Sequence, residues 1–152
     1  MIKKSGSIAL LAVVGLAIAL FMILPTNAHA SNPVDITGAT SVADIKAEIQ
    51  DEIDAIADTG GSVVVEGTFT GADAILELVI PADVRVTWNA EYEGEVLTLI
   101  YLNGQGSFEV VEGKITNTMD RDSGSDYIPS VIFSQSPSLI ISGGEVLATG
   151  SG

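Results

Sequence analysis

Cysteine is absent from this chain of 152 residues, and its one histidine is His29. Without cysteine the fold has no disulfides, so its stability depends on the packing of side chains. His29 lies in an N-terminal segment that the sequence predicts to be removed, which would leave the mature protein without an imidazole. These absences exclude enzymes that use a cysteine nucleophile, a histidine acid–base group or histidine metal ligands.

Basic residues are also few: the chain has 6 lysines and arginines against 20 aspartates and glutamates. Two of the lysines, Lys3 and Lys4, lie in the same N-terminal segment. The mature part therefore has 4 basic and 20 acidic residues, a net charge of −16. Such a surface repels nucleic acid and anionic lipid headgroups. The composition predicts no nucleic-acid partner and favours cations and neutral ligands.

The N-terminal segment, residues 1–30, has the organisation of a signal peptide. Two lysines precede an apolar run from Ile8 to Leu24, and Ala28–Ala30 supplies small residues at a cleavage site. The alternative is an uncleaved membrane anchor. However, the run contains Gly15, reaches only about the lower length limit for a membrane span and ends before Pro25. We therefore expect a secreted or cell-surface protein that begins near Ser31.

After a short lead-in, residues 31–40, the pattern predicts an amphipathic helix over residues 41–59, within an N-terminal capping region of residues 41–61. Ser41 has the sequence context of an N-cap, with Asp44 three residues later. Gly60 and Gly61 supply the glycine stop. One face carries an apolar stripe of Ile45, Ile49, Ile53 and Ile56. A partner-binding helix would show the same stripe, but the apolar strand that follows favours burial in the core.

From residue 62 onward the sequence predicts short strands separated by turns, with no second helix. One pattern recurs: an apolar residue stands three positions before a glycine or asparagine. Gly67, Asn89, Gly113 and Gly144 share this register, at spacings of 22, 24 and 31 residues. Glycine and asparagine most readily take a left-handed backbone conformation, and repeats of this length are typical of stacked coils.

This register predicts which side chains stack on one another in successive coils, about 4.8 Å apart. The predicted inward columns are Val64–Val86–Val110–Ile141, Val84–Phe108–Leu139, Leu76–Ile100–Val131 and Leu78–Leu102–Phe133. Among outward residues, Arg85 falls over Glu109 and Lys114 over Glu145, so that opposite charges lie on neighbouring strands. Glu91 does not fit, because it falls in an otherwise apolar column.

The predicted helix, followed by Gly60–Phe69, Leu78–Pro81 and Val84–Val86, resembles the N-terminal cap and first coils of right-handed parallel β-helices of the pectate-lyase-like superfamily. The segment Leu139–Val146 resembles the repeats of secreted bacterial surface proteins that are adhesin-like or carbohydrate-binding. The resemblance implies a mainly β fold: a short right-handed parallel β-helix of about four coils over residues 62–152, behind an N-terminal amphipathic capping helix.

This chain does not match the catalytic residues of that superfamily. The resemblance implies aspartates with a histidine in polygalacturonase-like members, and an arginine or lysine base beside calcium-binding aspartates in pectate lyases. The arginines of this chain are Arg85, expected to pair with Glu109, and Arg121 in an acidic loop. We therefore predict no catalytic residues and a non-enzymatic module for surface interaction, with glycans or surface proteins as partners. The alternative is a truncated polysaccharide lyase or glycoside hydrolase.

A loop insertion supplies the candidate metal site. The last spacing, 31 residues, exceeds the previous one, 24, by 7, and the surplus falls around residues 120–127. Insertions in repeat proteins often emerge on the functional side. Asp120, Asp122 and Asp126 could place oxygen ligands around calcium, the one candidate cofactor, although Gly124 occupies the third ligand position of an EF-hand-like spacing. The alternative is a solvated polar loop.

Aromatic side chains supply the candidate glycan site. Trp88, Tyr101 and Tyr127 are the rings predicted to stack on a sugar, with Tyr92 as a further exposed aromatic. Tyr101 alternates with inward residues, and Trp88 falls in a column of glutamates, so both rings are expected at the surface. The alternative is that they are isolated exposed aromatics without a function.

The C-terminal end of the predicted coils has no cap. After residues 146–148 the sequence has neither a helix nor a polar segment that would cover the last coil. An open end exposes unpaired backbone groups and the ends of apolar columns. We therefore expect self-association, or a further chain segment, at this end.

Overall fold

The structure is a computed structural model that describes residues 29–30, 33–121 and 128–151. It is mainly β, with parallel sheets and one long helix in the described part. The predicted signal peptide falls on residues outside the description except for its last two. These two form strand β1 (His29–Ala30), which pairs with Gly61 and Ser62. None of the helices in the described ranges has the length and apolar character that a membrane span requires.

The strands form three sheets, and every pairing between them is parallel. The first sheet holds β1, β2 (Val34–Asp35), β3 (Gly61–Glu66), β6 (Val84–Trp88), β9 (Ser107–Val110) and β12 (Ser138–Ile141). The second holds β4 (Thr68–Ala72), β7 (Glu91–Gly94), β10 (Lys114–Asn117) and β13 (Glu145–Ala148). The third holds β5 (Leu76–Ile80), β8 (Thr98–Gly104) and β11 (Ser130–Ser134).

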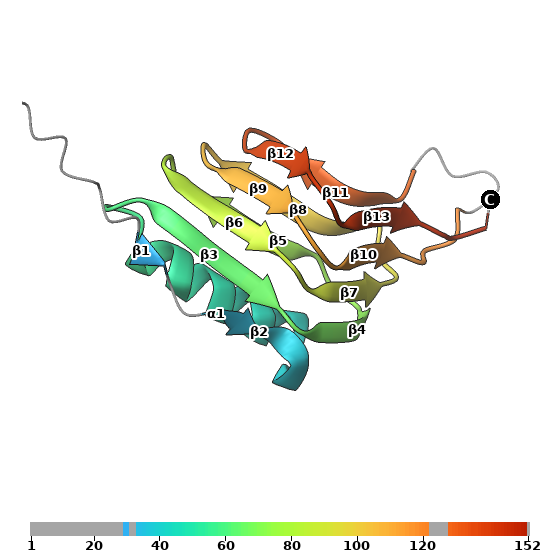
Figure 1. Cartoon of the computed structure of the whole chain (residues 1–152). Helices are drawn as coiled ribbons and strands as arrows, with labels where there is room; N and C mark the ends of the chain where they lie inside the picture. The colour runs from blue at the N-terminus through green and yellow to red at the C-terminus, as the bar shows by residue number, and fades with distance from the viewer. Residues whose placement is uncertain (1–28, 31–32, 122–127, 152) are drawn as a thin grey trace, which may run out of the picture.

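From β3 onward the chain visits the three sheets in a fixed order, and each strand lies beside the strand three elements later (Figure 1). One passage through the sheets is called a coil below. Side chains that point inward from all three sheets form a single apolar core. The core of each coil is therefore continued by the core of the next.

Helix α1 (Val42–Ala55) begins as expected but is shorter than the predicted 41–59. Ser41 is its N-cap, and the Ser41 hydroxyl accepts a hydrogen bond from the backbone N–H of Asp44 at 3.2 Å. The predicted apolar stripe is buried in the core, where α1 lies against β3 and β5. The expected N-terminal position is wrong, because β1, β2 and a short 3₁₀ helix (Ile36–Gly38) precede α1 in the chain. The glycine stop is confirmed: Gly60 has φ +71° and its N–H donates to the carbonyl of Ile56.

The predicted register of the first sheet is wrong by one residue. The pairs Thr68–Glu91, Glu91–Lys114 and Lys114–Glu145 give spacings of 23, 23 and 31 residues, in place of 22, 24 and 31. The observed inward columns are Val63–Val86–Phe108–Leu139 and Val65–Trp88–Val110–Ile141. In the third sheet Leu76–Ile100 and Leu78–Leu102 are confirmed, but Ile132 and Ser134 continue them in place of Val131 and Phe133.

The error arises at Asn89. Gly67 and Gly113 take the expected left-handed conformation, with φ of +99° and +87°, whereas Asn89 does not. Ala90 occupies the equivalent corner, since its carbonyl accepts from Lys114 as that of Gly67 accepts from Glu91. Side chains alternate along a strand, so a slip of one residue moves each of them to the opposite face.

Correcting the register resolves the misfit at Glu91. Tyr92, one residue later, fills the apolar column of Phe69 and Ile115, and Glu91 points outward. The predicted opposition of Lys114 and Glu145 is confirmed. Two register errors therefore have one cause.

Candidate functional site

Trp88, predicted to lie at the surface, is fully buried. Its ring centroid lies 5.6 Å from that of Phe108 and 5.8 Å from that of Tyr92, and its indole N–H donates to the carbonyl of Ala90 at 3.0 Å. The expectation of an exposed Trp88 is wrong because the register slip reverses its direction. A sugar cannot reach this ring in the folded chain.

Tyr92 is buried as well, and its hydroxyl has no hydrogen-bond partner within the described part of the chain. Burial raises the pKa of the Tyr92 phenol, and the negative charge of Asp73 raises it further. The phenol therefore stays neutral and serves the core. It is not placed for glycan stacking.

Tyr101 points outward as predicted, but one face of its ring is covered. Tyr101 stacks on Phe133 with ring centroids 5.5 Å apart and an interplanar angle of 11°. Its hydroxyl donates to the side-chain oxygen of Gln135. Glu77 is its neighbour on the other side. Tyr101 is therefore part of a side-chain ladder along the third sheet, and Tyr127 lies outside the described residues.

Of the three predicted calcium ligands, the structure describes Asp120 alone; Asp122 and Asp126 lie outside the described residues. The Asp120 carboxylate accepts hydrogen bonds from the backbone N–H of Ser151 at 2.7 Å and from the Ser151 hydroxyl at 2.9 Å. Among the residues described, no group of three acidic, histidine or cysteine side chains is placed to hold a metal. The calcium site stays a prediction.

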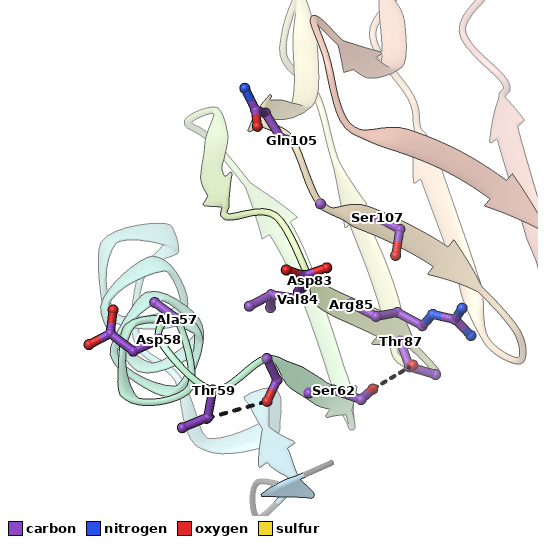
Figure 2. Close-up of a pocket in the computed structure, with 13 residues that line it drawn as sticks. Ala57, Asp58, Thr59, Ser62, Asp83, Val84, Arg85, Thr87, Gln105 and Ser107 are labelled. Carbon is purple, nitrogen blue, oxygen red and sulfur yellow. Dashed lines mark hydrogen bonds between the residues drawn. The ribbon is translucent and has the colours of Figure 1, made fainter. Parts of the chain in front are cut away.

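A groove of about 870 Å³ lies elsewhere, on the outer face of the first sheet. It runs from the C-terminal end of α1 across the starts of β3, β6 and β9 (Figure 2). Residues 57–62, 83–85, 87 and 105–107 line it. Its walls are the turns through which the chain enters the first sheet from α1 and from the third sheet.

Asp83 shapes the centre of this groove through an unusual backbone conformation. With φ +66° it is the one residue other than glycine that has a positive φ in the described ranges. Its carbonyl accepts from the backbone N–H of Gly61 at 3.0 Å, and the Val84 N–H closes the turn onto Pro81 at 3.2 Å. Strained residues of this kind cluster at functional sites.

The opposite wall of this turn leaves no room for side chains. A Cβ on Gly60 would lie 3.0 Å from the Asp83 carbonyl oxygen, and one on Gly106 would collide with the backbone of Pro81 and Val84. Glycine is therefore required where the two turns approach each other. The groove has a fixed floor of backbone.

Outward side chains of three strands provide the chemistry of the groove. Ser62, Arg85 and Ser107 form one column across β3, β6 and β9. The hydroxyls of Ser62 and Thr87 are hydrogen-bonded at 3.2 Å, side by side in Figure 2. Asp58, Asp83 and Gln105 add carboxylate and amide groups at the rim. The groove thus offers both hydrogen-bond donors and acceptors.

Arg85 is the cation of the groove and is more than half exposed. Its guanidinium lies 3.2 Å from the carboxylate of Glu109, so the predicted ion pair is confirmed, although Ser107 is its direct strand partner. Arginine stays protonated in proteins. Arg85 can therefore orient a ligand but cannot accept a proton from one.

Sequence reasoning placed Arg85 and Glu109 together but did not predict the groove. Ser62, Asp83 and Ser107 were missed because they carry no motif. One signal was available: Pro81-Ala82-Asp83 between two apolar strands is typical of a turn, and aspartate tolerates a left-handed conformation. Comparisons of the chain with protein-family models, with curated proteins and with solved structures found no match.

Proposed function

We propose that the chain is a secreted or cell-surface module that binds a neutral glycan in the groove across β3, β6 and β9. The observation that carries this proposal is the groove itself, in which serine and threonine hydroxyls surround an exposed, fixed guanidinium. Sugars present closely spaced hydroxyls that both donate and accept hydrogen bonds. The lining residues offer partners of both kinds.

The proposed architecture is a short right-handed parallel β-helix that is similar to the pectate-lyase-like superfamily. The fixed order in which the chain enters three parallel sheets supports this interpretation. In such a fold an outward sheet face is rigid, because the core behind it fixes each strand. A site built on rigid strands holds its polar groups in place before the ligand arrives.

The charge of the protein favours a neutral ligand. The mature part predicted from the sequence has a net charge of −16, which would repel polyanions at long range. Arg85 is already partly neutralised by Glu109, so the groove is not a strong anion site. A hydroxyl pair of a neutral sugar can accept from the guanidinium without displacing Glu109.

The same ion pair supports binding over catalysis. A polysaccharide lyase needs a group that removes a proton, and the charged Arg85 does not supply one. A truncated lyase or glycoside hydrolase is the alternative function. It predicts turnover of a polysaccharide such as polygalacturonate.

A glycan array tests this proposal, run with neutral and acidic glycans on the purified chain, with and without calcium. Arg85→Gln should lower affinity for the bound glycan by about tenfold, because a charge-assisted hydrogen bond is lost. Lys114→Gln is the matched control: it removes an exposed cation of the second sheet, outside the groove, and should leave affinity unchanged. Equal effects of the two variants, absence of any glycan signal, or turnover of polygalacturonate would contradict the proposal. The calcium arm separately tests Asp120, Asp122 and Asp126.

A further inference from the structure

All three sheets end in the same coil. β11, β12 and β13 are the terminal strands of the third, first and second sheets, and each is hydrogen-bonded to a neighbour on one side only. We call residues 128–151, which contain these strands, the open coil. The outer edge of each strand presents backbone N–H and C=O groups in the arrangement that another strand would pair with.

The open coil also exposes the ends of the apolar columns. Val63, Val86 and Phe108 are fully buried, whereas Leu139, the next member of their column, is 40% exposed. Ile141 is 54% exposed at the end of the other column of the first sheet. These side chains point toward the core but have no coil above them.

An aromatic stack ends at the same place. Tyr101 covers one face of Phe133, and Phe133 is 50% exposed. The hydrogen-bonded edges, the apolar columns and the aromatic stack therefore stop together. A surface that completes one of them is in position to complete the others.

The open coil is nearly free of charge in a strongly acidic chain. Glu145 is the one charged residue in the sequence of residues 128–151, whereas acidic residues are frequent throughout residues 35–126. Two copies of this chain repel each other over most of their surfaces. They can approach closely with little repulsion where their open coils meet.

The opposite end of the sheets is closed, which limits how two copies can stack. Helix α1 covers the core beside β3 and β5, at the end remote from the open coil (Figure 1). The Gln50 side chain pairs with the β5 edge: its amide donates to the Val79 carbonyl and its oxygen accepts from the Val79 N–H, both at 3.0 Å. A head-to-tail filament is therefore blocked.

We propose that the open coil binds the open coil of a second copy, forming a closed twofold dimer. A twofold axis across the end of the sheets reverses the strand direction, so the strands of the two copies meet antiparallel. The dimer buries Leu139 and Ile141 of both copies against each other. This inference does not depend on the glycan site, which lies on the outer face of the first sheet.

Analytical ultracentrifugation of the purified, processed chain tests the dimer. We expect a monomer–dimer equilibrium at micromolar concentrations that shifts toward dimer as salt is raised, since screening weakens the repulsion of two acidic copies. Ile140→Lys places a charge on the outward side of β12 and should weaken dimerisation by about tenfold or more. Ile75→Lys is the matched control, because Ile75 is similarly exposed in the first coil, and should leave dimerisation unchanged.

Circular dichroism shows whether each variant is folded, and Ser138→Lys at the start of β12 provides a second variant if Ile140→Lys unfolds. A monomer at all concentrations, assemblies larger than a dimer, or equal effects of Ile140→Lys and Ile75→Lys would each overturn the proposal. So would an open coil that stays monomeric alone and is covered by another protein or by a further chain segment.

Discussion

The two ends of the stacked sheets are built from the same kinds of residues and differ in what lies beyond them. At one end α1 covers the core, and Gln50 pairs with the edge of β5. At the other end β11, β12 and β13 have free edges, and the inward Leu139 and Ile141 are about half exposed. Residues of one column are buried or exposed according to the presence of a neighbouring coil.

This comparison shows how stability is distributed in a stacked fold. Each coil contributes little alone and is stabilised by the contacts with the coils on either side. A single side-chain amide at Gln50 substitutes for part of the missing strand, because it presents a donor and an acceptor with the spacing of a peptide group. The open coil has no such substitute within the described residues.

The largest predicted effect contrasts two members of one column. Trp88→Ala should lower the free energy of unfolding by about 3–5 kcal/mol, because it empties the centre of the core. Ile141→Ala, at the exposed end of that column, should cost only about 1 kcal/mol. Urea unfolding of dilute monomer measures both. Similar losses in the two variants would show that the ends are equally well covered.

Asn117 tests how the open coil is attached. Its buried amide donates to the carbonyls of Val96 and Ser130 at 2.8 and 2.9 Å, and its oxygen accepts from the Met119 N–H at 3.1 Å. Asn117→Ala leaves these groups unsatisfied and should cost about 2–3 kcal/mol.

The loss at Asn117 should appear first as faster hydrogen exchange in β11, whose first residue is Ser130. Asn103→Ala, which removes one local hydrogen bond at the surface of β8, is the control and should cost less than about 1 kcal/mol. An unchanged exchange rate in β11 of Asn117→Ala would argue against this role.

Removing Gln50 should make the closed end resemble the open one. Gln50→Ala frees the backbone of Val79 and should cost about 1 kcal/mol. Gln50→Glu can still accept from Val79 but cannot donate, so its loss should be intermediate. Sedimentation should detect species larger than a dimer for Gln50→Ala, because a second edge becomes available. If assembly is unchanged, the helix alone closes this end.

The smallest predicted effect is the pH dependence of the helix cap. Hydrogen bonds from the side chains of Thr40 and Ser41 lower the pKa of Asp44 below its ordinary value of 3.8. A lowered pKa in the folded state contributes stability that is present above pH 3.8 and is lost as the pH falls through the folded pKa.

Thermal unfolding of the wild type and of Asp44→Asn measures this contribution. The wild type should be the more stable above pH 4, and the difference should shrink as the pH falls toward 3 and below. A difference independent of pH would exclude the Asp44 carboxylate as its source.

Much of the fold could be predicted from the sequence because periodic patterns report burial. The capped helix, the glycine stop, the corners at Gly67 and Gly113 and the ion pair of Arg85 were all predicted from local spacing. These features depend on residues a few positions apart, or on a repeat that is regular where they occur.

The direction of Trp88 could not be predicted because the second corner is atypical. Asn89 has the residue type expected at a left-handed corner, but Ala90 occupies it. Only the hydrogen bonds between coils distinguish the two residues. The groove was hidden for a similar reason: Ser62, Arg85 and Ser107 become neighbours only when three coils are stacked in the correct register.

Hydrogen–deuterium exchange of the wild type as a function of protein concentration tests the difference between the two ends most directly. We predict slow exchange at Val79 and across β6 to β10 at every concentration, and faster exchange in β11, β12 and β13 that becomes slow as the dimer forms. Uniform protection of all coils in dilute solution, unaffected by concentration, would contradict the account.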